Sequence, residues 1–232
     1  MIESTLKQAT VLVVGGSSGI GLAVARLARR EGARVVVASR GAPERMAALP
    51  SPLDSIEAHA FDILAPADHV RLFETLGAFD HLVVAVRPDM RSGAFLEIAV
   101  DEAKSAFETK FWGLCRLIQA AHPYLRASGS ITLTSGIAGE KIYAGASTMA
   151  LINSATETLC RTLAVELAPV RVNCVSPGFV APKPARLEEE ADRFPLKRLA
   201  SVEEVASAYL WLMANPYATG TVSVVDGGAR LI

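Results

Sequence analysis

Short apolar runs alternate with longer amphipathic stretches along almost the whole chain. The short runs are rich in valine and mostly apolar on both faces, which is typical of strands buried in a parallel sheet. We expect strands at residues 10–14, 34–39, 56–61, 81–86, 130–134, 170–175 and 221–225. Between them apolar residues recur with helical spacing, and we expect helices at residues 20–31, 65–76, 101–126, 145–167 and 201–213.

This alternation predicts an α/β fold: one Rossmann-type, doubly wound domain over residues 1–232, with seven parallel strands and helices on both faces. The chain has 232 residues, 51% of them hydrophobic, so it can bury a large core. Residues 179–195 depart from the alternation and hold three prolines around a charged piece. Such a segment either covers a ligand crevice or forms a solvated insertion.

Charge and composition narrow the classes of partner. The net charge of −1 gives no basic footprint for nucleic acid, and no apolar run approaches the ~18 residues of a membrane span. The first expected strand leaves no room for a signal peptide, so we expect a cytoplasmic protein. Cys115, Cys160 and Cys174 are expected as free thiols. The histidines show no metal-ligand spacing, so no metal site is expected; they stand at positions 59, 69, 81 and 122.

The turn after the first strand carries the strongest chemical signal. Glycines at 15, 19 and 21 stand between a strand and a helix, where a dinucleotide-binding turn requires them. Gly15 permits a sharp turn, Gly19 lets backbone amides approach a pyrophosphate, and Gly21 lets the helix pack on the strand. The helix N-terminus stabilises phosphate charge. We expect the dinucleotide to contact Gly15, Ser17, Ser18, Gly19, Ile20 and Gly21.

The end of the second strand indicates which dinucleotide is bound. An NAD site favours an Asp or Glu there to bind the ribose hydroxyls, whereas this chain has Ser39 and Arg40. A carboxylate would repel a 2′-phosphate, while Arg40 can pair with it and stack on adenine. We therefore expect NADP(H), with an ordinary surface arginine as the alternative interpretation of Arg40.

Over nearly its whole length the chain resembles the short-chain dehydrogenase/reductase family. The glycine turn matches the family's TGxxxGxG except that Val14 replaces the threonine, and residues 171–173 (RVN), 176–178 (SPG) and 226–228 (DGG) match later motifs. The residues 84–87 read VAVR where the family has NNAG, and Pro182 replaces the threonine after the PG element. The resemblance implies further cofactor contacts by Asp62, Ile63, Ala85, Asn153, Pro177, Gly178 and Val180.

The resemblance also implies four catalytic residues, and this sequence departs from each. Spacing from matching landmarks puts Gly136 at the family's serine, Met149 at its tyrosine, Asn153 at the lysine four residues later, and Lys110 at its asparagine. In the family the tyrosine delivers a proton as hydride arrives, and the lysine lowers the phenol's pKa and binds the nicotinamide ribose. Met149 carries no such proton, and Asn153 can still hydrogen-bond a ribose hydroxyl but adds no charge.

Three residues are candidates for the missing proton donor. Lys110 would face the active site, and a buried lysine can have a lowered pKa; it could instead lie in a water channel or pair with a carboxylate. Tyr143 carries a phenol near the crevice by analogy, or is a half-buried loop aromatic. Ser135 stands one place before the family's serine, so a shift of one residue would bring its hydroxyl into place.

Three functions remain open. The first is an NADP(H)-dependent oxidoreductase acting on a carbonyl or alcohol with a rebuilt proton donor. The second is a non-catalytic nucleotide-binding sensor or partner subunit, and the third is a lyase or isomerase on the same scaffold. The family's corresponding long helices form a four-helix interface between subunits, so the resemblance also implies a homodimer or homotetramer.

Overall fold

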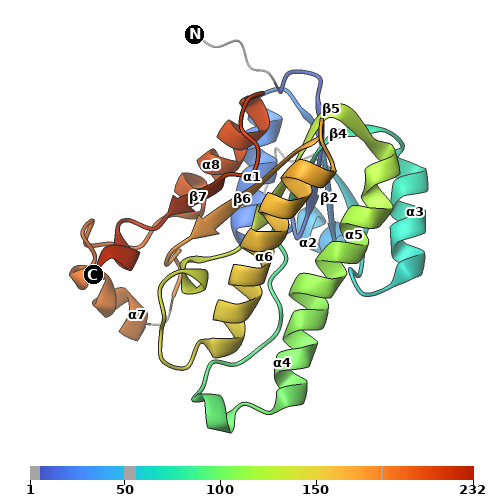
Figure 1. Ribbon diagram of the computed structural model, residues 1–232. Coiled ribbons are helices and arrows are strands. Elements are labelled where there is room, and N and C mark those ends of the chain that lie inside the picture. Colours follow the sequence, from blue (N-terminus) through green and yellow to red (C-terminus); the bar gives the residue numbers. More distant parts are fainter. Residues whose placement is uncertain (1–5, 50–55, 184) are drawn as a thin grey trace.

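A seven-stranded parallel sheet forms the centre of the computed structural model, which describes residues 6–49, 56–183 and 185–232 (Figure 1). The strand order is β3-β2-β1-β4-β5-β6-β7, and every pairing is parallel. The strands are β1 Thr10–Val14, β2 Arg34–Ser39, β3 Ile56–Ala60, β4 Phe79–Val84, β5 Leu125–Thr134, β6 Arg171–Pro177 and β7 Val222–Val225. The expected doubly wound α/β fold is confirmed.

Two layers of helices cover the two faces of the sheet. On one face α1 Gly19–Arg30, α2 Ala42–Ala47 and α8 Val202–Ala214 pack on the strands. On the other lie α3 Pro66–Leu76, α5 Gly113–Ala121 and α6 Ser147–Glu166. Alternate valines and leucines of β1 enter the two resulting cores, because successive side chains of a strand point to opposite faces. The continuous apolar runs of the sequence therefore reflect burial on both sides.

The helix expected over residues 101–126 is divided in the structure. It runs as α4 Val100–Phe107, a π-helical turn Glu108–Trp112, and α5 Gly113–Ala121. Residues 122–126 do not continue the helix, so the expected boundary was wrong. Pro123 follows the end of α5, and proline is unfavourable in a helix interior. The strand β5 then begins at Leu125, five residues earlier than the apolar pattern indicates.

Two short helices were not predicted. The helix α2 follows the second strand directly, and α7 Ala185–Glu190 lies inside the irregular proline-containing stretch. The connection between β4 and α4 is long and holds one short 3₁₀ turn, Phe95–Glu97. The fourth strand spans Phe79–Val84 rather than residues 81–86, so Ala85 already lies in the loop beyond the sheet. None of the described helices is long and apolar enough to cross a membrane.

The RVN motif of β6 connects the sheet to its last helix and strand. The Arg171 guanidinium donates hydrogen bonds to three backbone carbonyls at and beyond the end of α8. The Asn173 amide donates to Ala218 O and accepts from Thr221 N. These bonds satisfy buried carbonyls that have no partner within the helix. The motif therefore fixes the C-terminal part of the fold, and its side chains do not carry the site chemistry.

Candidate functional site

The residues expected to bind the dinucleotide gather at the carboxyl edge of the sheet. Because all strands run in the same direction, the segments after β1, β2, β3, β4, β5 and β6 meet along this edge. The strand order reverses between β1 and β4, and in doubly wound sheets ligands bind in the crevice at such a switch point. The structure thus brings the sequence-predicted cofactor residues to one place.

The glycine turn packs tightly on its inner side and is open on its outer side. Gly15 has a φ of +84°, and a Cβ there would lie 2.7 Å from Ala85 O. Gly19, at φ +52°, would meet no atom within 4 Å, so its outer surface is open. Ser18 is the N-cap of α1, yet its side chain makes no capping hydrogen bond. The first amides of α1 are therefore available to an anion, which fits a pyrophosphate.

Hydrogen bonds link three polar side chains between the glycine turn and the end of β2. The hydroxyls of Ser17 and Ser39 lie 2.7 Å apart, and Arg45 Nη1 donates to Ser17 Oγ at 3.2 Å. Arg40 is exposed beside them, with no ion pair among the described residues. Two guanidinium groups and two hydroxyls fit a phosphate monoester. Sequence reasoning missed Arg45, because it lies on the short helix α2 that the pattern did not predict.

The remaining cofactor candidates line the same edge. Asp62 Oδ1 accepts a hydrogen bond from Leu64 N in the turn after β3, and Ile63 is buried against the start of α5. Ala85 N donates to Val14 O, which fixes the end of β4 beside the glycine turn. After β6, Gly178 N donates to Val225 O, and Val180 forms an isolated bridge with Ala200. Pro177 is the last residue of β6.

Lys110 lies at the centre of the positions at which the family's catalytic residues are expected. It projects from the π-helical turn, and only 9% of the residue is exposed. Its Nζ donates to Asn153 Oδ1 at 2.7 Å, to Ser135 O at 3.4 Å, and approaches Met149 Sδ at 3.6 Å. None of the described carboxylates forms an ion pair with it. The alternative in which Lys110 pairs with a carboxylate is therefore not what the structure shows.

Burial lowers the pKa of Lys110 to about 8, because desolvation disfavours the ammonium. The positive charge of Arg87, in the loop after β4, acts in the same direction, whereas Cys174 and Glu157 oppose the shift. A lysine with such a pKa exists in both protonation states near neutral pH. It can therefore donate or accept a proton at this position.

Asn153 connects Lys110 to the loop after β5. Its Oδ1 accepts from the lysine, and its Nδ2 donates to Gly136 O at 3.2 Å. The residue is 2% exposed. Hydrogen bonds thus join three of the positions at which we expect departures from the family motif, Gly136, Asn153 and Lys110.

The other two donor candidates lie differently. Ser135 Oγ donates to Glu157 Oε1 at 2.8 Å, so its hydroxyl is engaged by α6. Tyr143 packs edge-on against Phe179, with ring centroids 5.8 Å apart, in an apolar cluster with the C-terminal segment. Its Oη is buried without a hydrogen-bond partner, and burial together with Asp226 raises its pKa. Of the three candidates, Lys110 is the one that hydrogen-bonds the side chain of Asn153 and approaches Met149 Sδ.

The described residues contain no group of three His, Cys, Asp or Glu side chains arranged to hold a metal ion. The thiols of Cys115, Cys160 and Cys174 are free. Burial raises the pKa of Cys160 to about 12 and that of Cys174 to about 11, so both stay protonated at neutral pH. Neither is suited to act as a nucleophile.

Comparison with known proteins places this geometry in context. Residues 14–230 match the family model described as enoyl-(acyl carrier protein) reductase. The human 3-oxoacyl-(acyl-carrier-protein) reductase is 34% identical over 231 residues, covering 95% of this chain and 97% of the relative. A solved small-chain dehydrogenase in complex with NADPH is 33% identical, with a TM-score of 0.80, covering 97% of this chain and all of that one. A short chain dehydrogenase from Bacillus anthracis shares the fold, with 24% identity, a TM-score of 0.88, and coverage of 98% and 99%.

Replacing Lys110 with methionine tests the buried ammonium through stability. The folded-state pKa of about 8 lies below the usual 10.5, so the unfolded chain binds more protons between these pH values, and stability of the native protein rises with pH there. Below pH 8 the buried charge lowers the free energy of unfolding by its full amount, about 3 kcal/mol. We expect Lys110→Met to gain stability relative to the native protein at pH 7, and most of that difference to disappear at pH 10.5. Urea denaturation at both pH values measures it.

The control for this experiment is Lys7→Met, at an exposed position before β1. Its stability relative to the native protein should not depend on pH over the same range. A constant difference between Lys110→Met and the native protein from pH 7 to pH 10.5 would show that Lys110 keeps an ordinary pKa in the folded state.

Proposed function

Since the chain belongs to the short-chain dehydrogenase/reductase family of oxidoreductases, we propose that it transfers hydride between NADP(H) and a carbonyl or alcohol substrate, with Lys110 as the proton donor. The observation that carries this proposal is the position of Lys110 Nζ, 2.7 Å from Asn153 Oδ1 and 3.6 Å from Met149 Sδ. A protonatable group with a lowered pKa thus occupies the site at which the family's tyrosine and lysine are replaced.

The residues at the carboxyl edge of the sheet support NADP(H) as the cofactor. The open amides at the start of α1 suit its pyrophosphate, and the cluster of Ser17, Ser39, Arg40 and Arg45 suits its 2′-phosphate. The relative solved with NADPH supports the same choice. Bound in its reduced form, this cofactor would supply the hydride.

The proton step follows from the chemistry of Lys110. In the reducing direction, negative charge develops on the substrate oxygen, and the Lys110 ammonium donates a proton to it. In the oxidising direction the neutral amine takes the proton from the alcohol. Acid–base catalysis is most effective when the pKa lies near the working pH, which a value of about 8 satisfies. Met149 has no transferable proton, and the Ser135 hydroxyl is bonded to Glu157.

Removal of the Lys110 amine should abolish most turnover. We expect Lys110→Met to lower the rate of NADPH oxidation with a carbonyl substrate by ~10²–10⁴, because it removes a positioned general acid. In the native protein the reduction rate should be level below pH 8 and fall above it, since only protonated Lys110 donates. The absorbance of the reduced nicotinamide, followed across a panel of aldehydes and ketones, measures both effects.

The matched control is Lys7→Met, at the amino end of the sheet and away from the candidate site, which should keep the native rate. Full activity of Lys110→Met would assign the proton to another group, with Tyr143→Phe as the next variant to assay. Tight NADPH binding without turnover on any carbonyl substrate would favour the alternative, a nucleotide-binding sensor or partner subunit.

Preference for NADP(H) should depend on both arginines near Ser39. A charge-assisted hydrogen bond contributes about 1.5–3 kcal/mol, so Arg40→Ala and Arg45→Ala should each raise the Kd for NADPH roughly 10- to 100-fold. The Kd for NADH, which lacks the 2′-phosphate, should change little. Titration of the nicotinamide fluorescence gives both constants. Arg34→Ala, at the opposite end of β2, is the control, and equal losses for both dinucleotides would contradict the assignment.

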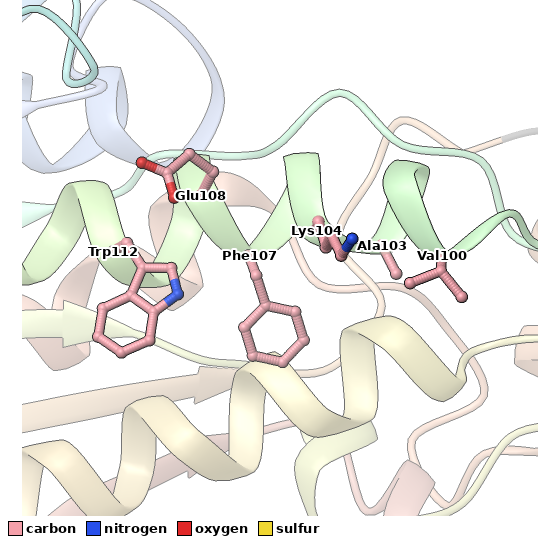
Figure 2. Close-up of a pocket in the computed structure, with 6 residues that line it drawn as sticks. All are labelled: Val100, Ala103, Lys104, Phe107, Glu108 and Trp112. Carbon is pink, nitrogen blue, oxygen red and sulfur yellow. The ribbon is translucent and has the colours of Figure 1, made fainter.

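We also propose that the protein assembles as a homodimer or homotetramer through α4 to α6. Figure 2 shows Val100, Phe107 and Trp112 projecting from one side of the α4 helix and its π-helical extension. They line an open, mostly apolar groove, completed by Ala103, Lys104 and Glu108. Val100 is 69% and Trp112 52% exposed. Assembly through this surface would bury these apolar side chains away from water.

A charge placed in this surface should weaken the assembly. Trp112→Glu is expected to lower the molar mass in solution, measured by light scattering, because a buried unpaired carboxylate is unfavourable in an interface. Val70→Glu on α3, where the native residue is 57% exposed, is the matched control and should leave the mass unchanged. A native protein that is already monomeric at assay concentration would contradict the proposal.

A further inference from the structure

The Asn153 amide is held from both ends. Its Oδ1 accepts the shortest hydrogen bond that Lys110 makes, at 2.7 Å, and its Nδ2 donates to Gly136 O at 3.2 Å. The donation to a carbonyl determines which end of the amide faces the loop, so the oxygen must face the lysine. Asn153 therefore presents an acceptor, and not a donor, to the ammonium.

The backbone does not explain the glycine at position 136. Its φ of 162° is ordinary extended backbone, open to any residue. A Cβ built there would lie 3.0 Å from Asn153 Nδ2, tighter than most real contacts, whereas its next neighbour, Pro177 O, would be at an ordinary 3.6 Å. What restricts the side chain at position 136 is thus the Asn153 amide. A serine hydroxyl would add one more atom to the same space.

We propose that Gly136, Asn153 and Lys110 form one interdependent unit, in which the absent side chain at 136 admits the Asn153 amide and this amide positions the Lys110 ammonium. Asn153 is then a positioning residue for the proton donor. Its effect on catalysis rests on the proposed function, whereas the coupling among the three residues does not. The residue at each of the three positions fits the site only when the other two are present.

Among the groups around Lys110, Asn153 is the one suited to position the ammonium. The lysine interacts electrostatically with Cys174 of β6, Glu157 of α6 and Arg87 in the loop after β4. Glu157 accepts the Ser135 hydroxyl and makes no ion pair with the lysine. Ser135 O is a backbone acceptor at the longer distance of 3.4 Å. Asn153 Oδ1 is thus the only side-chain oxygen among the described residues that accepts a hydrogen bond from the ammonium.

Two substitutions at position 153 should move the pKa of Lys110 in opposite directions. Asn153→Leu, which keeps the branching at Cγ, removes the acceptor and should lower the pKa of Lys110 below that of the native protein. Asn153→Asp places a negative charge against the ammonium and should raise it. NMR titration of the lysine Cε and Nζ signals measures the pKa, with Lys110→Met identifying the resonance. The next residue on α6, Ser154, donates its hydroxyl to Gly139 O and not to the lysine, so Ser154→Ala should leave the pKa of Lys110 unchanged.

Gly136→Ala supplies the decisive comparison. It should displace the amide and lower the pKa of Lys110 as Asn153→Leu does, and it should add no further shift when combined with Asn153→Leu. An unchanged pKa in Gly136→Ala, or shifts that add in the double variant, would overturn the proposal. This titration uses protein without substrate, so its outcome is separate from whether the protein turns over a carbonyl compound.

A stability measurement covers the case in which Gly136→Ala does not fold. Asn153→Lys alone places two ammonium groups in contact and should lower the melting temperature, and Lys110→Asn alone removes the cation. The double variant Lys110→Asn/Asn153→Lys restores one amide facing one ammonium, and should recover most of the melting temperature lost in Asn153→Lys. A double variant no more stable than Asn153→Lys would overturn the pairing.

For the catalytic part, the readout is the pH profile of the reduction. In Asn153→Asp the fall in rate should move to higher pH, following the lysine. If Lys110 responds as expected but no variant or native protein shows turnover, the unit stands and the proposed function fails. If turnover occurs with a profile that ignores substitutions at 153, the positioning role is overturned and the oxidoreductase remains.

Discussion

The parallel register of the sheet is the constraint on which every other feature depends. Because the strands run in one direction, the segments that follow them reach a common edge, which brings together residues as distant in sequence as Gly15, Ser135 and Gly178. Close contact between the glycine turn and Ala85 O, where a Cβ at Gly15 would lie at 2.7 Å, fixes the junction of β1 and β4. The sheet thus positions the loops of the candidate site, and the helical segments carry Lys110 and Asn153.

The ammonium of Lys110 is destabilised by burial, and neighbouring dipoles offset part of this loss of hydration. A charge with 9% exposure and no ion pair among the described residues loses much of its hydration, which lowers its pKa to about 8. Neutral dipoles from Asn153 and the backbone offset part of that loss without fixing the proton. A carboxylate partner would have stabilised the charge and raised the pKa, leaving a poorer donor. The buried ammonium thus lowers the stability of the fold, and its lowered pKa is what the proposed proton transfer requires.

Much of the fold could be predicted from the sequence, because period and composition report burial directly. The valine-rich runs located all seven strands, and the glycine turn located the crevice. The pattern failed where local chemistry overrides periodicity: at Pro123, which ends the helix early, and at α2, which is too short for a helical period. For the site, the resemblance to the family, with spacing counted from its matching motifs, placed Lys110, Gly136, Met149 and Asn153 together. It did not show that Ser135 bonds Glu157, that Tyr143 packs on Phe179, or that Arg45 reaches Ser17, since side-chain direction has no signature in the sequence.

The π-helical turn explains how a lysine from this helix reaches the site. One extra residue within Glu108–Trp112 shifts the register of the helix and turns Lys110 inward, while Phe107 and Trp112 stay on the outer side. Gly113 then follows, where a Cβ would lie 3.2 Å from both Glu108 O and an Ile63 methylene. The helix can therefore approach the sheet closely just beyond the turn. The cation of the site therefore comes from Lys110 on this turn, and α6 contributes the neutral amide of Asn153, which accepts a hydrogen bond from the ammonium. The expected departures from the family's motif at positions 110, 136 and 153 are thus joined by hydrogen bonds, which is the basis of the unit proposed above.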